Sequence, residues 1–196
     1  MNQKNLLEVD WSQIPAPTDD GAAAHLAGMM IPPVSLVATN DTVVTLSALP
    51  GRTIVFAYPR TGEPGKISLV EDWDMIPGAR GCTPQTCSFR DLFAELKAAG
   101  AAQVFGLSTQ SNAYQTEMAS RLHLPFPVLS DEKLELTRAL DLPTMEVAGL
   151  TLIRRLALVI DDSRITHVFY PVFPPDRNAG DVLAWLKDNP APQPRD

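Results

Sequence analysis

The stretch PGARGCTPQTCSFRD, residues 77–91, holds both cysteines of this 196-residue chain and begins a clearly patterned helix. Thr83 is predicted to be the N-cap and Pro84 the first helical residue, where a missing N–H costs nothing. Apolar residues then recur at intervals of three and four over residues 89–96, and Gly100 is placed to end the helix. The sequence therefore predicts a helix that carries both cysteines at its start.

The positions of the two thiols on this helix predict different reactivities. Cys82 would lie at the positive end of the helix dipole, near unpaired backbone N–H groups, and both features favour a thiolate over a thiol. Cys87 follows five residues later, where the neighbouring N–H groups are committed to helical bonds. We therefore expect Cys82 to be the nucleophile and Cys87 to be the more ordinary thiol.

The spacing of the cysteines limits how they can pair. Two residues five apart in one continuous helix have Cα atoms roughly 8–9 Å apart, beyond the ~7 Å that a disulfide tolerates. A helix that starts at Thr83 would place Cys82 just before the cap, and only a small adjustment would then join it to Cys87. Otherwise a disulfide requires the first turn to unwind.

The composition is that of a soluble acidic protein. Hydrophobic residues make up 45% of the chain, enough for one sizeable core, and we expect a single domain with tails. The formal net charge of −7 argues against a nucleic-acid or anionic-membrane partner. No apolar run approaches ~18 residues and the first residues do not resemble a secretory signal, so a cytoplasmic protein without a membrane span is expected.

Strand and helix patterns alternate along the rest of the chain. Strands are expected at 34–38 and 42–46 as a hairpin, and at 53–58, 103–107, 127–129, 156–160 and 165–169, and helices at 111–122, 131–140 and 180–187. The run TIVFAY at 53–58 is β-rich throughout, which is typical of a central strand buried on both faces. The pattern predicts an α/β fold: a central mixed sheet flanked by helices, with an N-terminal β-hairpin extension.

Three segments lie outside this pattern. Residues 1–33 are rich in proline and small residues and are expected to form a loosely attached N-terminal arm before a domain at 34–188. Residues 189–196 are a proline-rich C-terminal tail. A long segment without a regular period, the 59–80 loop, separates the central strand from the cysteine helix, and Trp73 in it is expected to be exposed. Loops of this length inside compact domains are usually functional.

Several segments resemble one known family. GCTPQTCSFRD at 81–91 resembles the G-C-T-x-Q-x-C-x-F-R-D motif of the peroxiredoxin Q, or bacterioferritin comigratory protein, subfamily. FPVLSD at 126–131 and RLALVID at 155–161 resemble two further segments of that subfamily. The resemblance covers about residues 30–188 and implies a thioredoxin-like fold.

The resemblance implies a thiol-dependent peroxidase that reduces hydrogen peroxide and organic hydroperoxides. In the family the first cysteine attacks the peroxide and becomes a sulfenic acid, and the second condenses with it to an intramolecular disulfide. Cys82 would therefore be peroxidatic and Cys87 resolving. An external dithiol, thioredoxin or glutaredoxin, would reduce the disulfide. We expect no cofactor and no metal, and a monomer suffices because both cysteines lie in one chain.

Peroxide reduction also requires groups that hold the peroxide and stabilise the departing oxygen. In peroxiredoxins the arginine that opens the strand at 156–160 lies beside the reactive cysteine, and by resemblance this is Arg155. Its neighbour Arg154 would point to the opposite face of the strand and is the second choice.

The family's proline and threonine stand seven and three residues before the reactive cysteine, where this chain has Met75 and Ala79. Pro59 and Thr61 instead follow directly after the central strand. We therefore expect Pro59 and Thr61 in those roles, the threonine hydroxyl bonding thiolate and peroxide. The 59–80 loop would then be an insertion that covers the active site and narrows the choice of peroxide.

Thr83 is an alternative source of this hydroxyl, although capping would already engage it. Two other functions stay open: a dithiol–disulfide oxidoreductase acting on proteins, whose usual motif is C-x-x-C, and a non-catalytic redox-sensing or partner-binding domain of the same fold. The histidines His25, His123 and His167 are scattered, so a Cys–His hydrolase lacks a local partner for either cysteine. A structural zinc site lacks ligands.

Overall fold

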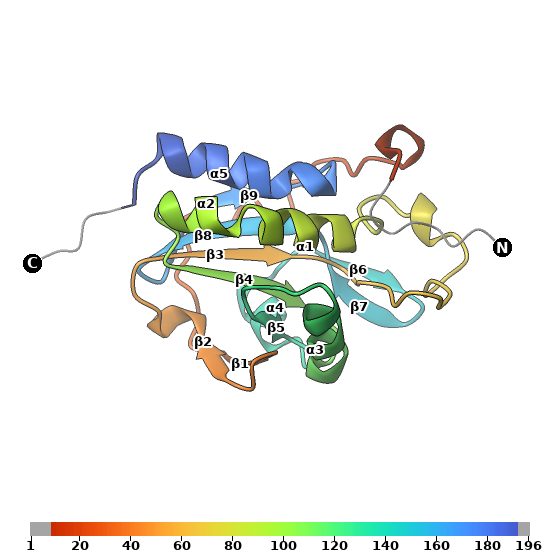
Figure 1. Ribbon diagram of the computed structural model, residues 1–196, viewed down its shortest axis with the longest axis horizontal. Coiled ribbons are helices and arrows are strands. Elements are labelled where there is room, and N and C mark those ends of the chain that lie inside the picture. Colours follow the sequence, from red (N-terminus) through yellow and green to blue (C-terminus); the bar gives the residue numbers. More distant parts are fainter. Residues whose placement is uncertain (1–8, 192–196) are drawn as a thin grey trace, which may run out of the picture.

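The computed structural model describes residues 9–191, which form a seven-stranded mixed sheet, a separate two-stranded hairpin and five α-helices (Figure 1). The strands of the large sheet are β1 (Ser35–Ala38), β2 (Val43–Thr45), β3 (Arg52–Ala57), β4 (Gln103–Ser108), β5 (Val128–Ser130), β8 (Leu156–Asp161) and β9 (Arg164–Phe169). The separate hairpin consists of β6 (Thr144–Val147) and β7 (Leu150–Ile153). The helices are α1 (Cys82–Asp91), α2 (Phe93–Ala98), α3 (Asn112–Arg121), α4 (Glu135–Leu140) and α5 (Asn178–Asp188).

The large sheet has the strand order β2-β1-β5-β4-β3-β8-β9. β3, β4 and β5 run parallel, and the other neighbours pair antiparallel. β3 lies between β4 and β8 with all of its residues buried, so the prediction of a central strand is confirmed. The predicted α/β fold, a central mixed sheet flanked by helices with an N-terminal hairpin at one edge, is confirmed as well.

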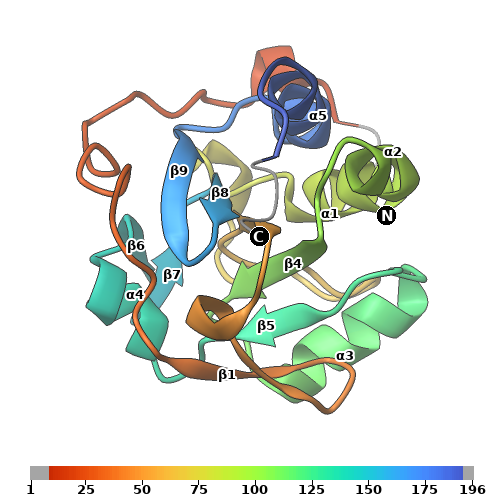
Figure 2. The same cartoon turned by 90° about the vertical axis from the view of Figure 1, so that its left-hand side faces the viewer.

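Alternate residues of β3 face the two sides of the sheet. Ile54 and Phe56 pack with α1, α2, α3 and α5, whereas Val55 and Ala57 pack with α4 and the N-terminal segment (Figure 2). Phe56 stacks on Phe89 of α1, with ring centroids 4.0 Å apart. Because burial of one Phe side chain is worth about 1.5–3 kcal/mol, this contact holds the cysteine helix firmly against the central strand.

The cysteine helix begins earlier than predicted. Gly81, not Thr83, is the N-cap, and Cys82 is the first helical residue. Gly81 has a φ of +106°, a left-handed conformation that glycine adopts without strain, and its carbonyl accepts the first helical bond from the Gln85 N–H. Pro84 is tolerated at the third helical position because the first four N–H groups of a helix have no helical partner.

Other helix boundaries also differ from the prediction. Leu92, with a ψ of 12°, divides the predicted single helix into α1 and α2, and Gly100, with a φ of +103°, ends the second. α4 starts later than predicted. The carboxylate of Asp131 accepts the backbone N–H groups of Leu136 and Thr137, so it caps the helix from outside.

The N-terminal arm is attached more firmly than expected in residues 9–33. The side chain of Leu26 is fully buried in the core on the α4 side of the sheet. Asp20 accepts a hydrogen bond from Arg154 at 2.7 Å. The expectation of loose attachment is wrong here, because the apolar residues of this segment pack from irregular turns and therefore show no period. Residues 1–8 of the predicted arm lie outside the described residues.

α5 closes the domain as predicted and begins two residues earlier. The tail predicted at 189–196 is described only to residue 191, and 192–196 lie outside the described residues. No helix within residues 9–191 is long and apolar enough to cross a membrane.

The β6–β7 hairpin was not predicted, and it packs against the 59–80 loop (Figure 1). Trp73 and Ala79 of the loop form a small apolar core with Val147 and Leu152 of the hairpin. Trp73 is therefore buried, with 7% of its surface exposed, and the expectation of an exposed side chain is wrong. The two strands have only four residues each, and buried and exposed residues do not alternate along them, so the sequence gives no clear period of two.

Candidate active site

Three loops converge at one edge of the large sheet. β3 and β4 are parallel, so their carboxyl ends lie at the same edge, and the antiparallel β8 begins there. The 59–80 loop follows β3, Gln110 follows β4, and Arg155 precedes β8. The topology therefore brings together side chains from distant parts of the chain, next to the start of α1.

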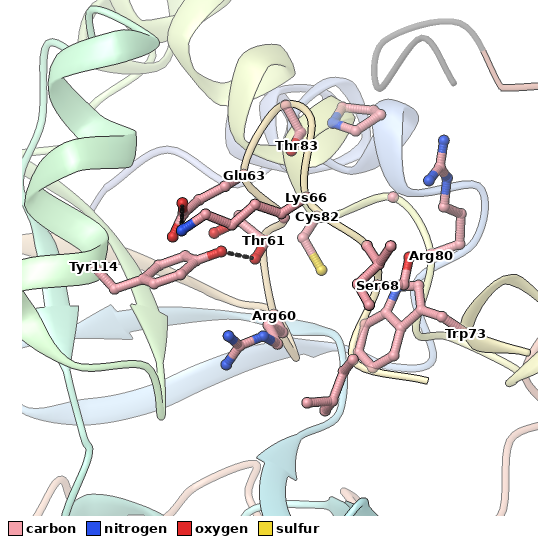
Figure 3. A pocket seen from close by; sticks show the side chains of 15 residues that line it. Arg60, Thr61, Glu63, Lys66, Ser68, Trp73, Arg80, Cys82, Thr83 and Tyr114 are labelled. Atoms are coloured by element: carbon pink, nitrogen blue, oxygen red, sulfur yellow. Dashed lines mark hydrogen bonds and ion pairs between the residues drawn. The ribbon is translucent and has the colours of Figure 1, made fainter. Parts of the chain in front are cut away.

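A pocket of about 410 Å³ opens at this edge and is lined by Cys82 (Figure 3). Most of its lining comes from the 59–80 loop, with further contributions from the first turn of α1 and from Tyr114 of α3. In Figure 3, Tyr114 and Trp73 lie on opposite sides of Cys82. The pocket is far larger than the ~30 Å³ that a water-sized molecule occupies, so it has room for an oxygen compound with a substantial substituent.

The thiol of Cys82 is buried and has two polar neighbours. Nη2 of Arg155 donates a hydrogen bond to Sγ at 3.3 Å, and the thiol can donate to the carbonyl of Ala79 at 3.5 Å. Both side chains are nearly inaccessible, with exposures of 3% for Cys82 and 2% for Arg155. A guanidinium in this position stabilises negative charge on the sulfur, and it does so strongly because little water screens the interaction.

Arg155 is held in place by several acceptors. Its Nη1 donates to Oε1 of Gln85 at 2.5 Å, and Nη2 also donates to the carbonyls of Gly78, Ala79 and Arg80 at 3.1–3.3 Å. Gln85 in turn donates to Asn178 of α5 at 2.9 Å. The guanidinium thus joins the end of the 59–80 loop, α1 and the start of β8.

Arg154 does not reach the thiol. Its Nε donates to the Thr144 carbonyl and its Nη1 to Asp20, on the other side of the strand. The geometry thus favours Arg155 over its neighbour, in the order the sequence predicted.

Thr61 lies in the same pocket as Cys82, and 1% of its surface is exposed. Its N–H and its hydroxyl both donate to Oε1 of Gln110, at 2.9 and 3.1 Å. The hydroxyl of Tyr114 donates to the Thr61 carbonyl at 2.9 Å. Pro59 is also buried, and its carbonyl accepts a hydrogen bond from Ser108 at 3.2 Å.

Thr83 lines the pocket too. Because Gly81 is the N-cap, the Thr83 hydroxyl has no capping role, contrary to the expectation from sequence. Backbone N–H groups of the first helical turn, which includes Cys82, have no helical acceptor and can bind an oxygen atom or anion at this end of the pocket.

Cys87 is the second free thiol and lies one and a half turns further along α1. Burial raises its pKa above the ordinary value, although the nearby Arg90 guanidinium partly offsets this effect. Since both cysteines belong to one continuous helix, their Cα atoms are roughly 8–9 Å apart, and a disulfide requires the first turn of α1 to unwind.

Two glutamines of this site were not predicted. Gln85 is part of the quoted cysteine motif, yet its amide had no assigned role there. Gln110 stands at the carboxyl end of a strand beside the central strand, where ligand-binding residues of α/β folds gather. That position is the signal that could have identified it.

Comparison with known proteins assigns the family. The Redoxin family model matches residues 26–183. Peroxiredoxin Bcp of Escherichia coli is 32% identical over 168 residues, which cover 83% of this chain and 96% of the relative. This chain belongs to the peroxiredoxin Q/Bcp branch of the Redoxin family.

Other members of the peroxiredoxin Q/Bcp branch agree. Chloroplastic peroxiredoxin Q of japonica rice is 30% identical over 162 residues, and the match covers 82% of this chain and 66% of the rice protein. The chain thus spans just under two thirds of the length of that relative. The crystal structure of peroxidoxin BcpB from Mycobacterium tuberculosis matches with a TM-score of 0.66 and 25% identity, covering 83% of this chain and 97% of that structure. The predicted thioredoxin-like fold and the predicted family are confirmed.

Proposed function

We propose that this member of the peroxiredoxin Q/Bcp branch is a thiol peroxidase that reduces hydrogen peroxide and organic hydroperoxides through Cys82. The observation that carries the proposal is the Cys82 thiol, 3.3 Å from the buried guanidinium of Arg155, in a pocket of about 410 Å³. The peroxiredoxin relatives support the same activity.

In the first step the Cys82 thiolate attacks the hydrogen-bearing oxygen of the peroxide. An S–O bond forms, the O–O bond breaks, and the departing hydroxide or alkoxide takes up a proton from solvent to give water or an alcohol. Arg155 and the free N–H groups at the start of α1 stabilise the negative charge that moves to the departing oxygen. Thr61 contacts the peroxide, and Pro59 fixes the backbone that carries Thr61.

In the second step Cys87 attacks the sulfenic acid of Cys82, an S–S bond forms and water leaves. Unwinding of the first turn of α1 brings the two sulfurs together. Cys87 is buried beyond this turn, so the unwinding has to extend to it. Exposure to water then removes the burial that raises the pKa of Cys87 and makes its thiolate easier to form. The conformational change therefore activates the resolving thiol as well as moving it.

The disulfide is returned to two thiols by thioredoxin or glutaredoxin, and the cycle runs in a monomer, since one chain holds both cysteines. We place this reaction in the cytoplasm, where these reductants maintain cell redox homeostasis.

The 59–80 loop covers the active site and narrows the choice of peroxide. The loop lines its side of the pocket with apolar side chains, those of Ile67, Leu69 and Trp73. Hydrogen peroxide has no apolar group that could pack against them. An organic substituent would bury part of this surface, which favours its hydroperoxide.

The test is turnover with thioredoxin, thioredoxin reductase and NADPH. We expect NADPH to be consumed only when hydrogen peroxide or cumene hydroperoxide is added, and Cys82→Ser to abolish this consumption. Faster reduction of insulin disulfides by dithiothreitol when this protein is added, without thioredoxin and without peroxide, would instead identify a dithiol–disulfide oxidoreductase. No turnover with any peroxide, with thioredoxin or with glutaredoxin, would overturn the peroxidase proposal in favour of a redox-sensing domain.

A further inference from the structure

A buried set of hydrogen bonds, which we call the Thr61 clamp, fixes Thr61 between Gln110 and Tyr114. The N–H and hydroxyl of Thr61 donate to Oε1 of Gln110, Nε2 of Gln110 donates back to the Thr61 carbonyl at 3.3 Å, and the Tyr114 hydroxyl donates to the same carbonyl at 2.9 Å. Figure 3 shows the last of these bonds at the wall of the pocket. Gln110 and Thr61 are 4% and 1% exposed, so water does not compete for the bonds between these two residues.

The direction of each bond in the clamp is determined. A backbone N–H can only donate, so the Gln110 atom that faces the Thr61 N–H must be the carboxamide oxygen, and the amide cannot be flipped. The Thr61 hydroxyl lies 3.1 Å from that same oxygen, which can only accept. The hydroxyl proton of Thr61 is therefore committed to Gln110.

Because its proton is bonded to Gln110, the Thr61 hydroxyl can act toward the pocket only as a hydrogen-bond acceptor. A threonine hydroxyl has one donor hydrogen and two acceptor lone pairs, and only the lone pairs remain. Thr61 can then accept the O–H of a peroxide but cannot donate to the Cys82 thiolate. A hydroxyl that donated to the thiolate would compete with Arg155 and weaken the nucleophile, whereas an acceptor holds the attacked oxygen by its hydrogen.

The backbone of Gln110 is held by side chains of β5 and α3. The backbone carbonyl of Gln110 accepts hydrogen bonds from the Ser130 hydroxyl at 2.8 Å and from the Gln115 side-chain amide at 3.0 Å. Gln115 also accepts a bond from the buried Tyr58 hydroxyl at 2.9 Å, at the end of the central strand. These bonds hold the backbone of Gln110 against the sheet and α3, while the N–H, hydroxyl and carbonyl of Thr61 hold its carboxamide.

We propose that Gln110 is a positioning residue that makes Thr61 an obligate hydrogen-bond acceptor for the O–H of the bound peroxide. This inference rests on the proposed peroxidase function. The attacked oxygen keeps its hydrogen throughout, from the hydroperoxide to the sulfenic acid, so no proton moves to Thr61. The clamp orients that oxygen toward Cys82, and the remaining chemistry is unchanged.

The first test compares Gln110→Met with Gln103→Met, the same substitution at an exposed position of β4. We expect Gln110→Met to lower the second-order rate constant for Cys82 oxidation by at least about tenfold, because small losses of alignment are costly in a bimolecular attack. Gln103→Met should react like the wild type. Alkylation of Cys82 by iodoacetamide should stay within about twofold in both variants, because the clamp does not act on the thiolate. A general structural disturbance would change oxidation and alkylation together, and that result would overturn the proposal.

The second test uses Gln110→Glu and its pH profile. A protonated glutamic acid offers the same C=O acceptor and one donor for the Thr61 carbonyl, so it preserves the clamp. An ionised glutamate still accepts from the N–H and hydroxyl of Thr61, but it has no donor for the Thr61 carbonyl. Its second carboxylate oxygen would instead repel that carbonyl oxygen and displace Thr61. We expect the rate of Gln110→Glu, relative to wild type, to be highest at acid pH and to fall as pH rises. A constant ratio across pH would contradict the proposal, and this readout also serves if Gln110→Met does not fold.

The third test is a double-mutant cycle with Thr61→Val. If Gln110 acts through the Thr61 hydroxyl, Gln110→Met should lower the rate less in the Thr61→Val variant than it does in the wild type. Full additivity would overturn the proposal. A wild type that does not react with peroxide would instead refute the proposed function, whereas a reactive wild type with an equally reactive Gln110→Met would refute only the role of Gln110.

Discussion

The guanidinium of Arg155 binds two groups at once: one of its terminal nitrogens donates to the Cys82 sulfur, and the other donates to Gln85. Nη2 reaches Sγ at 3.3 Å, and Nη1 reaches the glutamine at 2.5 Å. A lysine has one nitrogen at the end of a flexible stem and cannot occupy both places. Fixed geometry, and not charge alone, is therefore what this residue contributes.

Arg155→Lys should consequently slow the oxidation of Cys82 by hydrogen peroxide on the order of 10²–10³-fold, as expected for loss of a preorganised donor. Arg154→Lys is the matched control, since Arg154 binds Asp20 on the other side of the strand. The measurement is the second-order rate constant of the reduced protein in stopped flow. An Arg155→Lys rate within twofold of wild type would refute the role of the guanidinium.

Ile67 tests the 59–80 loop at the same scale, because it lines the pocket and 97% of its surface is exposed, so replacing it leaves the core intact. Ile67→Ser should lower kcat/KM for cumene hydroperoxide several-fold and leave the value for hydrogen peroxide unchanged, since only the larger substrate reaches this side chain. Val43→Ser, an exposed apolar residue of β2, is the control. Equal loss for both peroxides would contradict a role in substrate choice.

The sequence predicted residues of this site unevenly. Cys82 stands at the start of a patterned helix, and Arg155 opens a segment that resembles one of the family's strands, so both could be proposed from the residues around them. Gln110 bonds to Thr61 across 49 positions of the chain. Nothing near either residue carries that information, and only the pairing of β3 with β4 brings them together.

The proposed reaction cycle depends on the first turn of α1. This turn holds Cys82 next to Arg155, and the proposal requires it to unwind after oxidation so that Cys87 can reach the sulfenic acid. Gly81 at its start is tightly enclosed, since a Cβ there would lie 2.6 Å from Pro175 and 2.7 Å from Trp11. Trp11 and Pro175 thus help to hold the turn in its helical form.

Gly81→Ala should therefore destabilise the protein more than Gly149→Ala. Both glycines have positive φ, +106° and +76°, so both substitutions strain the backbone by about 1–2 kcal/mol. Only the Gly81 variant adds steric overlap, typically another 1–3 kcal/mol, because Gly149 has open space around it. Urea unfolding of the two reduced variants measures the difference. Equal losses of unfolding free energy would show that Trp11 and Pro175 do not constrain the turn.

Elements with a strong period were predicted closely, and weakly patterned ones were not. The continuous apolar run of β3 and the spacing of α5 gave boundaries within two residues. The β6–β7 hairpin was missed because its burial does not alternate. The two buried residues of β7 are neighbours: Leu152 lies in the small core with the 59–80 loop, and Ile153 lies in the main core with residues of the large sheet. The irregular turns of residues 22–31 were read as loose for the same reason.

At the scale of the whole molecule, α5 is joined to the sheet by a stack of rings. His167 of β9 lies parallel to Trp185 of α5, with centroids 4.8 Å apart, and the Arg52 guanidinium lies 5.3 Å from the centre of the Trp185 ring. Partial burial lowers the pKa of His167. Protonation of this imidazole would place a cation in a site that already contains one.

His167 should make the fold sensitive to mild acid. The pKa of His167 is lower in the folded protein than the ~6.5 of an unfolded chain, so above pH 6.5 both states are neutral and stability is complete. As pH falls through 6.5 toward the folded pKa, the unfolded state takes up the proton first and stability is lost. His167→Phe should therefore lose less unfolding free energy than wild type between pH 7 and 5, measured in urea. The exposed His123→Asn is the control, and identical losses in all three proteins would contradict the assignment.

The most direct test of the central claim is the intact mass of the reduced protein after one equivalent of hydrogen peroxide, beside Cys82→Ser and Cys87→Ser. We predict that the wild type loses two hydrogens and both free thiols, that Cys87→Ser gains one oxygen, and that Cys82→Ser does not change rapidly. These results would establish attack by Cys82 and resolution by Cys87. Rapid oxidation of Cys82→Ser, or no rapid change in any of the three proteins, would contradict a peroxidase centred on Cys82.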